Sequence, residues 1–505
     1  MFVKPVCAED GSRLWLPPEK NAHAKVSSND KNPTIELAVR ELQTQWKGAP
    51  VKLIISAKNN PENEEGYSIS GNRQKSVIIK SLSSEGLLYG AFHLLRLQQT
   101  GDDEGELNIS ESPAFNLRIL NHWDNIDGSI ERGYAGKSLW DWEDLPEKIS
   151  PRYTEYARAN ASIGINATVL NNVNANPQFI SREYLLKTAA LAQVFRPWGI
   201  KVYLSVNFSS PAELGGLPTS DPLNETVRQW WKDKAKEIYS IIPDFGGFLV
   251  KANSEGLPGP QDFGRTHADG ANMLAEALEP FGGIVMWRAF VYDAQSSDRA
   301  KQAYEEFKPL DGQFHKNVII QVKNGPIDFQ PREPFNPLFG AMQKTPLMLE
   351  LQITQEYLGQ SKQLAYLAPM YEECLQSDTY AEGQGSTVAK IITGKLFPQK
   401  ITAIAGVANT GKDVNWTGHL FAQSNWYCFG RLAWNPDLSS EEIADEWLKM
   451  TFTRNPAFVE PVKQMMLDSR EAMVSYMMPL GLAHLFAWEH HYGPDPGFHL
   501  PGARP

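Results

Sequence analysis

Eight apolar segments, each running into a polar exit, recur between residues 115 and 439. They are Leu117–Asn121, Ile165–Asn171, Lys201–Asn207, Gly246–Ala252, Gly283–Val291, Asn317–Lys323, Pro346–Gln352 and Thr402–Ala408. Helical patterns lie between most of them, at Tyr184–Phe195, Glu225–Ile241, Ala268–Leu278 and Ala300–Phe307. Strands that alternate with helices predict an α/β fold with a parallel sheet. Eight such units in roughly 325 residues fit a closed (β/α)₈ TIM barrel with insertions.

An open, doubly wound sheet is the alternative fold for strands that alternate with helices. That fold often carries a glycine-rich GxGxxG turn after its first strand. No such turn follows Leu117–Asn121. We therefore favour the closed barrel.

The regions on either side of the barrel show different patterns. Before residue 115, short strands such as Val51–Ser56 and Val77–Lys80 precede an amphipathic helix at Glu85–Gln99, which predicts a small α+β domain. After residue 439, Ser439 and the acidic residues that follow it are typical of a helix start. The predicted domains are an N-terminal α+β domain at 1–114, a catalytic barrel at 115–439, and the start of a truncated C-terminal helical domain at 440–505.

Polar side chains cluster at the predicted strand exits, where (β/α)₈ barrels carry their active sites. Amides are frequent there, at Asn121, Asn171, Asn207, Asn253, Asn324 and Asn409. A single polar strand exit is usually only solvated loop. The convergence of all eight exits favours a site for a sugar, whose hydroxyls need paired donors and acceptors.

Three carboxylates stand at these exits: Glu255, Asp328 and Glu356. Glycoside hydrolysis needs one protonated carboxyl to assist the leaving oxygen and a second, ionised carboxylate as base or nucleophile. Alternatively, Asp328 is a turn residue and Glu356 caps a helix. The pattern alone leaves both interpretations open.

Three cations share the same strands: Lys251, Arg288 and Lys323. The chain has a formal net charge of −11, so cations gathered in one place indicate an anionic ligand. A carboxylate matches the arginine fork. The alternative is that each cation forms a structural salt bridge with a neighbouring carboxylate.

Charge and composition argue against several other function classes. An acidic chain without a lysine- or arginine-rich block is a poor candidate for nucleic-acid binding, and no apolar run is long enough to span a membrane. Neither the cysteines nor the histidines, which include His484, His490, His491 and His499, follow a zinc-binding spacing. We expect no metal and no cofactor. The compartment stays open: periplasmic or secreted if Met1–Ala8 is the remnant of a signal peptide, otherwise cytoplasmic.

Long motifs at the strand exits resemble the α-glucuronidases of glycoside hydrolase family 67. They are His122–Trp142, Lys251–Pro260, Lys323–Pro334 and Leu351–Gly359. Trp488–Gly497 resembles a further downstream segment of that family. The resemblance runs from about residue 9 to the end of the chain.

The resemblance implies an inverting enzyme without a cofactor. Its substrate would be a small aldouronic xylo-oligosaccharide, from whose non-reducing end it removes glucuronic acid, often 4-O-methylated. Glu255 would be the general acid, and Asp328 and Glu356 would together form the base side. Lys251, Arg288 and Lys323 would hold the uronate. Trp123 would pack on the sugar, and Val173 would lie near the methoxy-bearing edge.

Two expectations concern what the chain lacks. Family members continue beyond the downstream segment and form homodimers through their C-terminal helical domain, so a dimer is doubtful for a chain that ends at Pro505. A catalytically impaired protein that binds aldouronic acids is therefore the alternative function. A substrate-assisted hexosaminidase is disfavoured, because such enzymes usually carry an adjacent acidic pair where this chain has Asn253-Ser254-Glu255.

Overall fold

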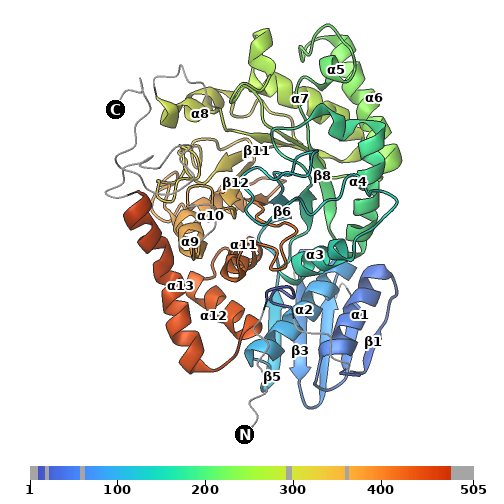
Figure 1. Ribbon diagram of the computed structural model, residues 1–505, viewed down its shortest axis with the longest axis vertical. Helices are drawn as coiled ribbons and strands as arrows, with labels where there is room; N and C mark the ends of the chain where they lie inside the picture. The colour runs from blue at the N-terminus through green and yellow to red at the C-terminus, as the bar shows by residue number, and fades with distance from the viewer. Residues whose placement is uncertain (1–9, 17–21, 57–62, 292–297, 359–362, 479–505) are drawn as a thin grey trace.

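The protein is described from a computed structural model that covers residues 10–16, 22–56, 63–291, 298–358 and 363–478. The four histidines considered above for metal binding, and the Trp488–Gly497 motif, lie outside these residues. Figure 1 shows an N-terminal sheet with its helices beside a larger barrel, and two C-terminal helices alongside both.

The N-terminal domain is a mixed five-stranded sheet with the order β1-β2-β4-β3-β5. Its strands are β1 (Val26–Ser28), β2 (Val51–Ile55), β3 (Tyr67–Asn72), β4 (Ser76–Ser81) and β5 (Glu106–Glu111). β1, β2 and β4 run parallel, and β3 is antiparallel to both of its neighbours. Helices α1 (Pro33–Gln45) and α2 (Ser84–Thr100) pack together and against the sheet. The predicted α+β fold of this region is confirmed.

The central part of the chain forms a closed barrel of eight parallel strands, as predicted. Around the barrel the order is β10-β11-β12-β13-β6-β7-β8-β9. The strands are β6 (Leu117–Asn121), β7 (Ala167–Val169), β8 (Lys201–Ser205), β9 (Gly247–Val250), β10 (Ile284–Arg288), β11 (Val318–Lys323), β12 (Leu347–Gln352) and β13 (Ala403–Val407). Every residue of β9, β11, β12 and β13 is buried, because helices cover the outside and side chains fill the inside.

Helices surround the barrel and connect its strands. They are α3 (Pro151–Ser162), α4 (Arg182–Phe195), α5 (Ser210–Glu213), α6 (Glu225–Ile241), α7 (His267–Leu278), α8 (Arg299–Phe307), α9 (Ala368–Gln376), α10 (Val388–Ile392) and α11 (Gln423–Trp434). Short 3₁₀ turns lie at Pro177–Ile180, Arg196–Trp198, Pro260–Phe263, Glu279–Phe281, Lys308–Leu310 and Leu420–Ala422. The four helices predicted between strands are all present.

The predicted strand bounds differ most from the structure at β10 and β7. β10 (Ile284–Arg288) is shorter than the predicted Gly283–Val291, and β7 (Ala167–Val169) is shorter than the predicted Ile165–Asn171. Asn166 pairs its side chain with the backbone N–H of Arg118 instead of continuing the strand. The Asn171 side-chain amide likewise donates to the carbonyl of Ser205 and accepts from the N–H of Ser205. Side chains that bond to backbone groups in this way compete with the ladder for the same partners.

The N-terminal domain covers the end of the barrel at which the strands begin. Arg118 of β6 is fully buried there. Its guanidinium donates to the carbonyl of Phe115 at 2.6 Å and to the Glu65 carboxylate at 2.6 Å. Glu41 of α1 accepts two hydrogen bonds, of 2.8 and 2.9 Å, from Arg158 of α3. Arg118 and Glu41 are buried charges that need these partners, so ion pairs as well as apolar contacts join the N-terminal domain to the barrel.

Two further helices, α12 (Ser440–Thr451) and α13 (Pro456–Met477), complete the described chain. Ser439 caps α12 and Glu442 returns the bond to form a capping box, so the predicted helix start is confirmed. Figure 1 shows both helices at the lower left of the view, where α12 contacts α2 of the N-terminal domain and both contact α9 of the barrel. The proposed domain boundaries at residues 114 and 439 stay predictions.

Candidate active site at the carboxyl ends of the strands

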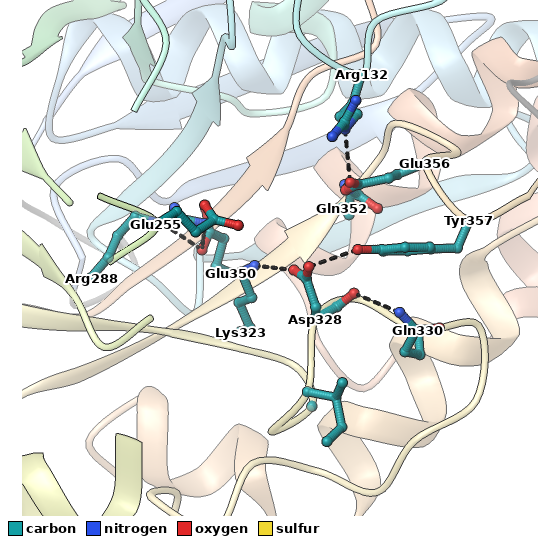
Figure 2. Close-up of polar contacts among 12 residues, drawn as sticks. Arg132, Glu255, Arg288, Lys323, Asp328, Gln330, Glu350, Gln352, Glu356 and Tyr357 are labelled. Carbon is teal, nitrogen blue, oxygen red and sulfur yellow. Dashed lines mark hydrogen bonds and ion pairs between the residues drawn. The ribbon is translucent and has the colours of Figure 1, made fainter. Parts of the chain in front are cut away.

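The predicted charged residues of the site come from strands β9 to β12 and the loops that follow them, and Trp123 and Val173 follow β6 and β7. Arg288 ends β10, Lys323 ends β11, and Glu350 lies in β12. Lys251 follows the last residue of β9 directly. Since parallel strands end at the same rim of a barrel, these side chains meet at one mouth, as Figure 2 shows for Arg288, Lys323 and Glu350.

The loop after β9 carries Glu255 in an unusual backbone conformation. Asn253 and Glu255 have φ of 50° and 52°, in the left-handed region. Asparagine adopts that region with little cost, but glutamate does so rarely. The Asn253 side chain holds the loop by accepting a hydrogen bond from the Gln261 N–H at 3.0 Å. Backbone strain of this kind is concentrated at functional sites.

Glu255 forms an ion pair with Lys251. The lysine ammonium also donates to Asn174 Oδ1 at 2.8 Å. Asn174 is fixed in turn by the Glu131 carboxylate, which accepts its Nδ2–H at 2.9 Å. The Lys251 side chain is only 2% exposed, whereas the Glu255 side chain is 43% exposed. The pair therefore joins a buried cation to an acid that faces outward.

Asp328 lies in the loop after β11 and forms an ion pair with Lys323. Its second oxygen accepts a hydrogen bond of 2.7 Å from the Tyr357 hydroxyl. Figure 2 shows the carboxylate of Asp328 between these two donors. The side chain is 13% exposed, so Asp328 is held more firmly than Glu255.

Arg288 of β10 is paired with Glu350 of β12, and only β11 lies between these two strands. Its Nε and Nη2 donate to one carboxylate oxygen at 3.0 and 2.9 Å. Both side chains are buried, at 1% and 0% exposure. The structural salt bridge left open by the sequence is thus present here, with an acid that the sequence reasoning did not single out.

Glu356 is held from two sides in the loop after β12. Arg132 Nε donates to one oxygen at 2.9 Å, and Gln352 Nε2 donates to the other at 2.6 Å. Arg132 itself has φ of 58° and comes from the long loop after β6. Among the described residues Glu356 caps no helix, and a carboxylate oxygen has two acceptor sites, of which each of these hydrogen bonds takes one.

Aromatic rings line the cation cluster. The guanidinium of Arg288 lies 5.8 Å from the ring centroid of Trp123 and 5.5 Å from that of Phe290. The ammonium of Lys323 lies 3.3 Å from the centroid of Phe290. The ring quadrupole attracts a cation that lies over an aromatic face, and the attraction is stronger where water is excluded. Val173 is buried beside Asn174, the partner of Lys251.

Glu333 shapes the loop that carries Asp328. Its carboxylate accepts hydrogen bonds from three backbone N–H groups, those of Ile327 at 2.7 Å, Asp328 at 3.3 Å and Gln330 at 2.9 Å. Phe329, inside this turn, has φ of 49°. A side chain at Gly325 would collide with the Glu333 carboxyl, so the small residue makes room for the acid.

The charges at the mouth shift the pKa values of both members of the Lys251–Glu255 pair. Burial lowers the pKa of the Lys251 ammonium, and the cations Arg288 and Lys323 lower it further, against the opposing effect of Glu255. Burial pushes the pKa of Glu255 up, but Lys251 and then Lys323 outweigh it, and the net pKa lies below its usual value. In this state Glu255 is ionised at neutral pH, whereas a general acid must carry a proton.

All eight residues predicted for the site lie at this mouth or in the loops around it. The sequence reasoning missed four of their partners: Arg132, Glu333, Glu350 and Tyr357. Glu350 carried a signal, since a carboxylate inside the apolar run Leu347–Gln352 needs a buried cation. Glu333 carried none, because its partners are backbone groups.

No group of three or more potential metal ligands is found among residues 10–16, 22–56, 63–291, 298–358 and 363–478. In the same ranges, no helix combines the length and the apolar character needed to cross a membrane.

The fold and the site define a (β/α)₈ barrel with carboxylates and cations interleaved at its mouth, an architecture that glycoside hydrolases use. The family model of the glycosyl hydrolase family 67 middle domain matches residues 97–416, and that of the family 67 C-terminus matches residues 417–502. The chain belongs to glycosyl hydrolase family 67.

Curated relatives include Alpha-glucuronidase A of Emericella nidulans, which is 44% identical over 449 residues, 86% of this chain and 52% of that protein. Alpha-glucuronidase of Hypocrea jecorina is 44% identical over 445 residues, again 86% of this chain and 52% of that protein. The chain thus spans about half the length of these two relatives.

Among solved structures, a GH138 enzyme targeting pectin rhamnogalacturonan II has a TM-score of 0.56 at 15% identity, covering 89% of this chain and 55% of that one. A GH20 exo beta-N-acetylglucosaminidase from Vibrio harveyi has a TM-score of 0.50 at 11% identity, covering 92% and 79%. At these identities the likeness concerns the fold.

Proposed function

We propose that this protein is an inverting α-glucuronidase that releases glucuronic acid, with or without a 4-O-methyl group, from the non-reducing end of xylo-oligosaccharides. The observation that carries the proposal is the interleaving of Lys251, Arg288 and Lys323 with Glu255 and Asp328 at one barrel mouth. A neutral sugar carries no charge that could pair with three buried cations. A uronate matches them in charge, and the names of the curated relatives point to the same substrate class.

In the proposed reaction, Glu255 gives a proton to the leaving glycosidic oxygen. Asp328 or Glu356 takes a proton from a water that attacks the anomeric carbon from the opposite face. Lys251, Arg288 and Lys323 hold the uronate, Trp123 packs on the sugar ring, and Val173 lies toward its methoxy edge. The firm hold on Asp328 and Glu356 is consistent with a base that must stay ionised and correctly aimed.

The first prediction tests both activity and stereochemistry. Incubation of the protein with an aldotriouronic acid should release β-glucuronate first, detected by proton NMR before mutarotation. Initial release of the α anomer would indicate retention and contradict the single displacement. Stable binding without any release would instead support the alternative, a protein that only binds aldouronic acids.

Glu255→Gln is the matched variant for the acid, since it keeps the shape and removes the proton. Turnover of the natural oligosaccharide should fall by at least about a hundredfold, the usual contribution of general acid catalysis. Activity close to that of the parent protein would overturn the assignment of Glu255. Circular dichroism confirms that the variant is folded.

A further inference from the structure

Every cation proposed to hold the uronate already has a carboxylate partner within the protein. Lys251 pairs with Glu255, Lys323 with Asp328, and Arg288 with Glu350. A ligand carboxylate entering this cluster must therefore either share a cation or replace one of these acids. Which acid is replaced decides how the site changes when it is filled.

The three pairs are not equally exchangeable. Glu350 is fully buried and receives two hydrogen bonds from Arg288. Asp328 is held by Lys323 and by the Tyr357 hydroxyl. Glu255 is held by Lys251, and its side chain is the most exposed of the three acids. When an ion pair opens, an exposed carboxylate gains hydration that offsets the lost attraction, whereas a buried one would be left unpaired.

Resting on the proposed function, we propose that the carboxylate of a bound uronate takes the place of Glu255 at Lys251, and that Glu255 takes up a proton as it is displaced. The substrate would thereby create its own proton donor. Lys251 keeps a counter-charge throughout, and Asn174 continues to hold its ammonium in place.

The net change in the charges around Glu255 favours its protonation, although Lys323 continues to oppose it. The groups that act on it directly are Lys251, Lys323 and Asp328. Arg288 acts through Lys251, and it is itself neutralised by Glu350. Once the uronate occupies Lys251, Glu255 has lost its main cation and faces two anions, the uronate and Asp328. Loss of an opposite charge and gain of a like charge both favour the protonated form of an acid.

The proton balance closes over one reaction. Glu255 takes one proton from solvent on binding and passes it to the leaving oxygen. The base takes one proton from the attacking water and returns it to solvent. A neutral sugar does not displace Glu255 and leaves it ionised, so this exchange selects for uronates at the chemical step as well as in binding.

Isothermal titration calorimetry with D-glucuronate tests the exchange without any turnover. Titration near pH 6 in two buffers of different ionisation enthalpy gives the number of protons bound with the ligand. We expect an uptake of between about half a proton and one proton per site, and up to about tenfold weaker binding for each unit of rising pH. D-glucose is the neutral control and should cause no uptake.

Two variants assign the proton. Glu255→Gln should still bind glucuronate, with affinity equal to or higher than the parent because Lys251 is released, but its proton uptake should fall close to zero. Asp328→Asn removes the other lysine-paired carboxylate, which is also one of the two anions beside Glu255, so proton uptake should fall only in part. Equal uptake by the parent and Glu255→Gln, or loss of uptake in Asp328→Asn alone, would overturn the inference.

The outcomes also separate this inference from the proposed function. Binding of glucuronate without proton uptake overturns the exchange at Lys251 and leaves the α-glucuronidase proposal standing. Failure to bind glucuronate at millimolar concentration overturns the proposed function and the exchange with it.

Discussion

At the scale of single residues, Glu333 has the clearest role outside the predicted site. Its carboxylate accepts hydrogen bonds from three backbone N–H groups of the turn that carries Asp328. It also occupies the space that a side chain at position 325 would need. Burial raises the pKa of Glu333, although the three N–H groups oppose the shift. Glu333 is a positioning residue, because it acts on Asp328 through the backbone.

Glu333→Gln should therefore lower kcat and leave KM almost unchanged. The amide offers one acceptor where the carboxylate offers two, and each lost bond to a buried donor costs about 1–3 kcal/mol. We expect kcat to fall by about tenfold or more in steady-state assays with an aldotriouronic acid. Glu183→Gln, at an exposed position of α4 where the acid pairs with Lys187, is the control and should change kcat little. An unchanged kcat for Glu333→Gln would rule out the positioning role.

At the scale of secondary-structure elements, α13 supports the same loop from the outside. Arg470 of α13 donates two hydrogen bonds, of 3.3 and 3.1 Å, to the carbonyl of Pro331. A second side of α13 holds the chain after β12, where Ser469 accepts the Tyr366 N–H at 2.8 Å. The helix thus supports the segments that carry Asp328 and Glu356.

Arg470→Ala should reduce kcat by about tenfold, since a small displacement of a catalytic group carries a large kinetic cost. Arg470 also pairs with Glu373 at the surface, and Glu373→Ala removes that pair alone. Exposed pairs contribute little, so Glu373→Ala should retain nearly full activity and melting temperature. Equal losses in both variants would show that the effect comes from the surface pair.

The elements differ in how far the sequence predicts them. The predicted bounds of strands β6 and β11 agree with the structure to within one residue. An apolar run that ends in polar residues can be buried in a barrel only as a strand whose polar end lies at the rim. Helix α6 was predicted at its observed bounds, Glu225–Ile241. The site was predicted less completely. Residue type located Lys251 and Glu255, but the partners Arg132 and Tyr357 depend on loop paths that no local pattern encodes.

At the scale of the whole molecule, Glu446 of α12 joins three parts of the chain. It accepts hydrogen bonds from Arg431 at 2.8 and 3.1 Å and from the Tyr427 hydroxyl at 2.9 Å, both on α11. Arg96 of α2, in the N-terminal domain, lies 3.8 Å away. Burial raises the pKa of Glu446, but Arg431 and Arg96 outweigh it and hold the pKa at about 2.

This lowered pKa predicts how stability depends on pH. The folded pKa of Glu446 lies below the ordinary 4.5, so its contribution is fully present above pH 4.5 and is lost as pH falls toward 2. A shift of this size corresponds to about 3 kcal/mol. Glu446→Gln should melt well below the parent at pH 6, because Arg431 and Arg96 lose their counter-charge.

Calorimetric melting temperatures at pH 6 and pH 3 test this prediction. The difference between the parent and Glu446→Gln should narrow at pH 3, where Glu446 begins to lose its charge in the parent too. Glu441→Gln, on the exposed side of α12, should differ little from the parent at either pH. A gap between the parent and Glu446→Gln that is the same at both pH values would contradict the assigned pKa.

The internal pairing of every cation at the mouth has a consequence for how fast a ligand arrives. Seen from beyond about 8–10 Å at physiological salt, each pair is a screened dipole with little net field. The chain as a whole carries −11, which repels an approaching uronate. Encounter therefore gains no long-range guidance, and the site's positive charge is felt only after contact. We therefore expect the uronate to associate without electrostatic acceleration, and the site to distinguish charged from neutral sugars only once the ligand is bound.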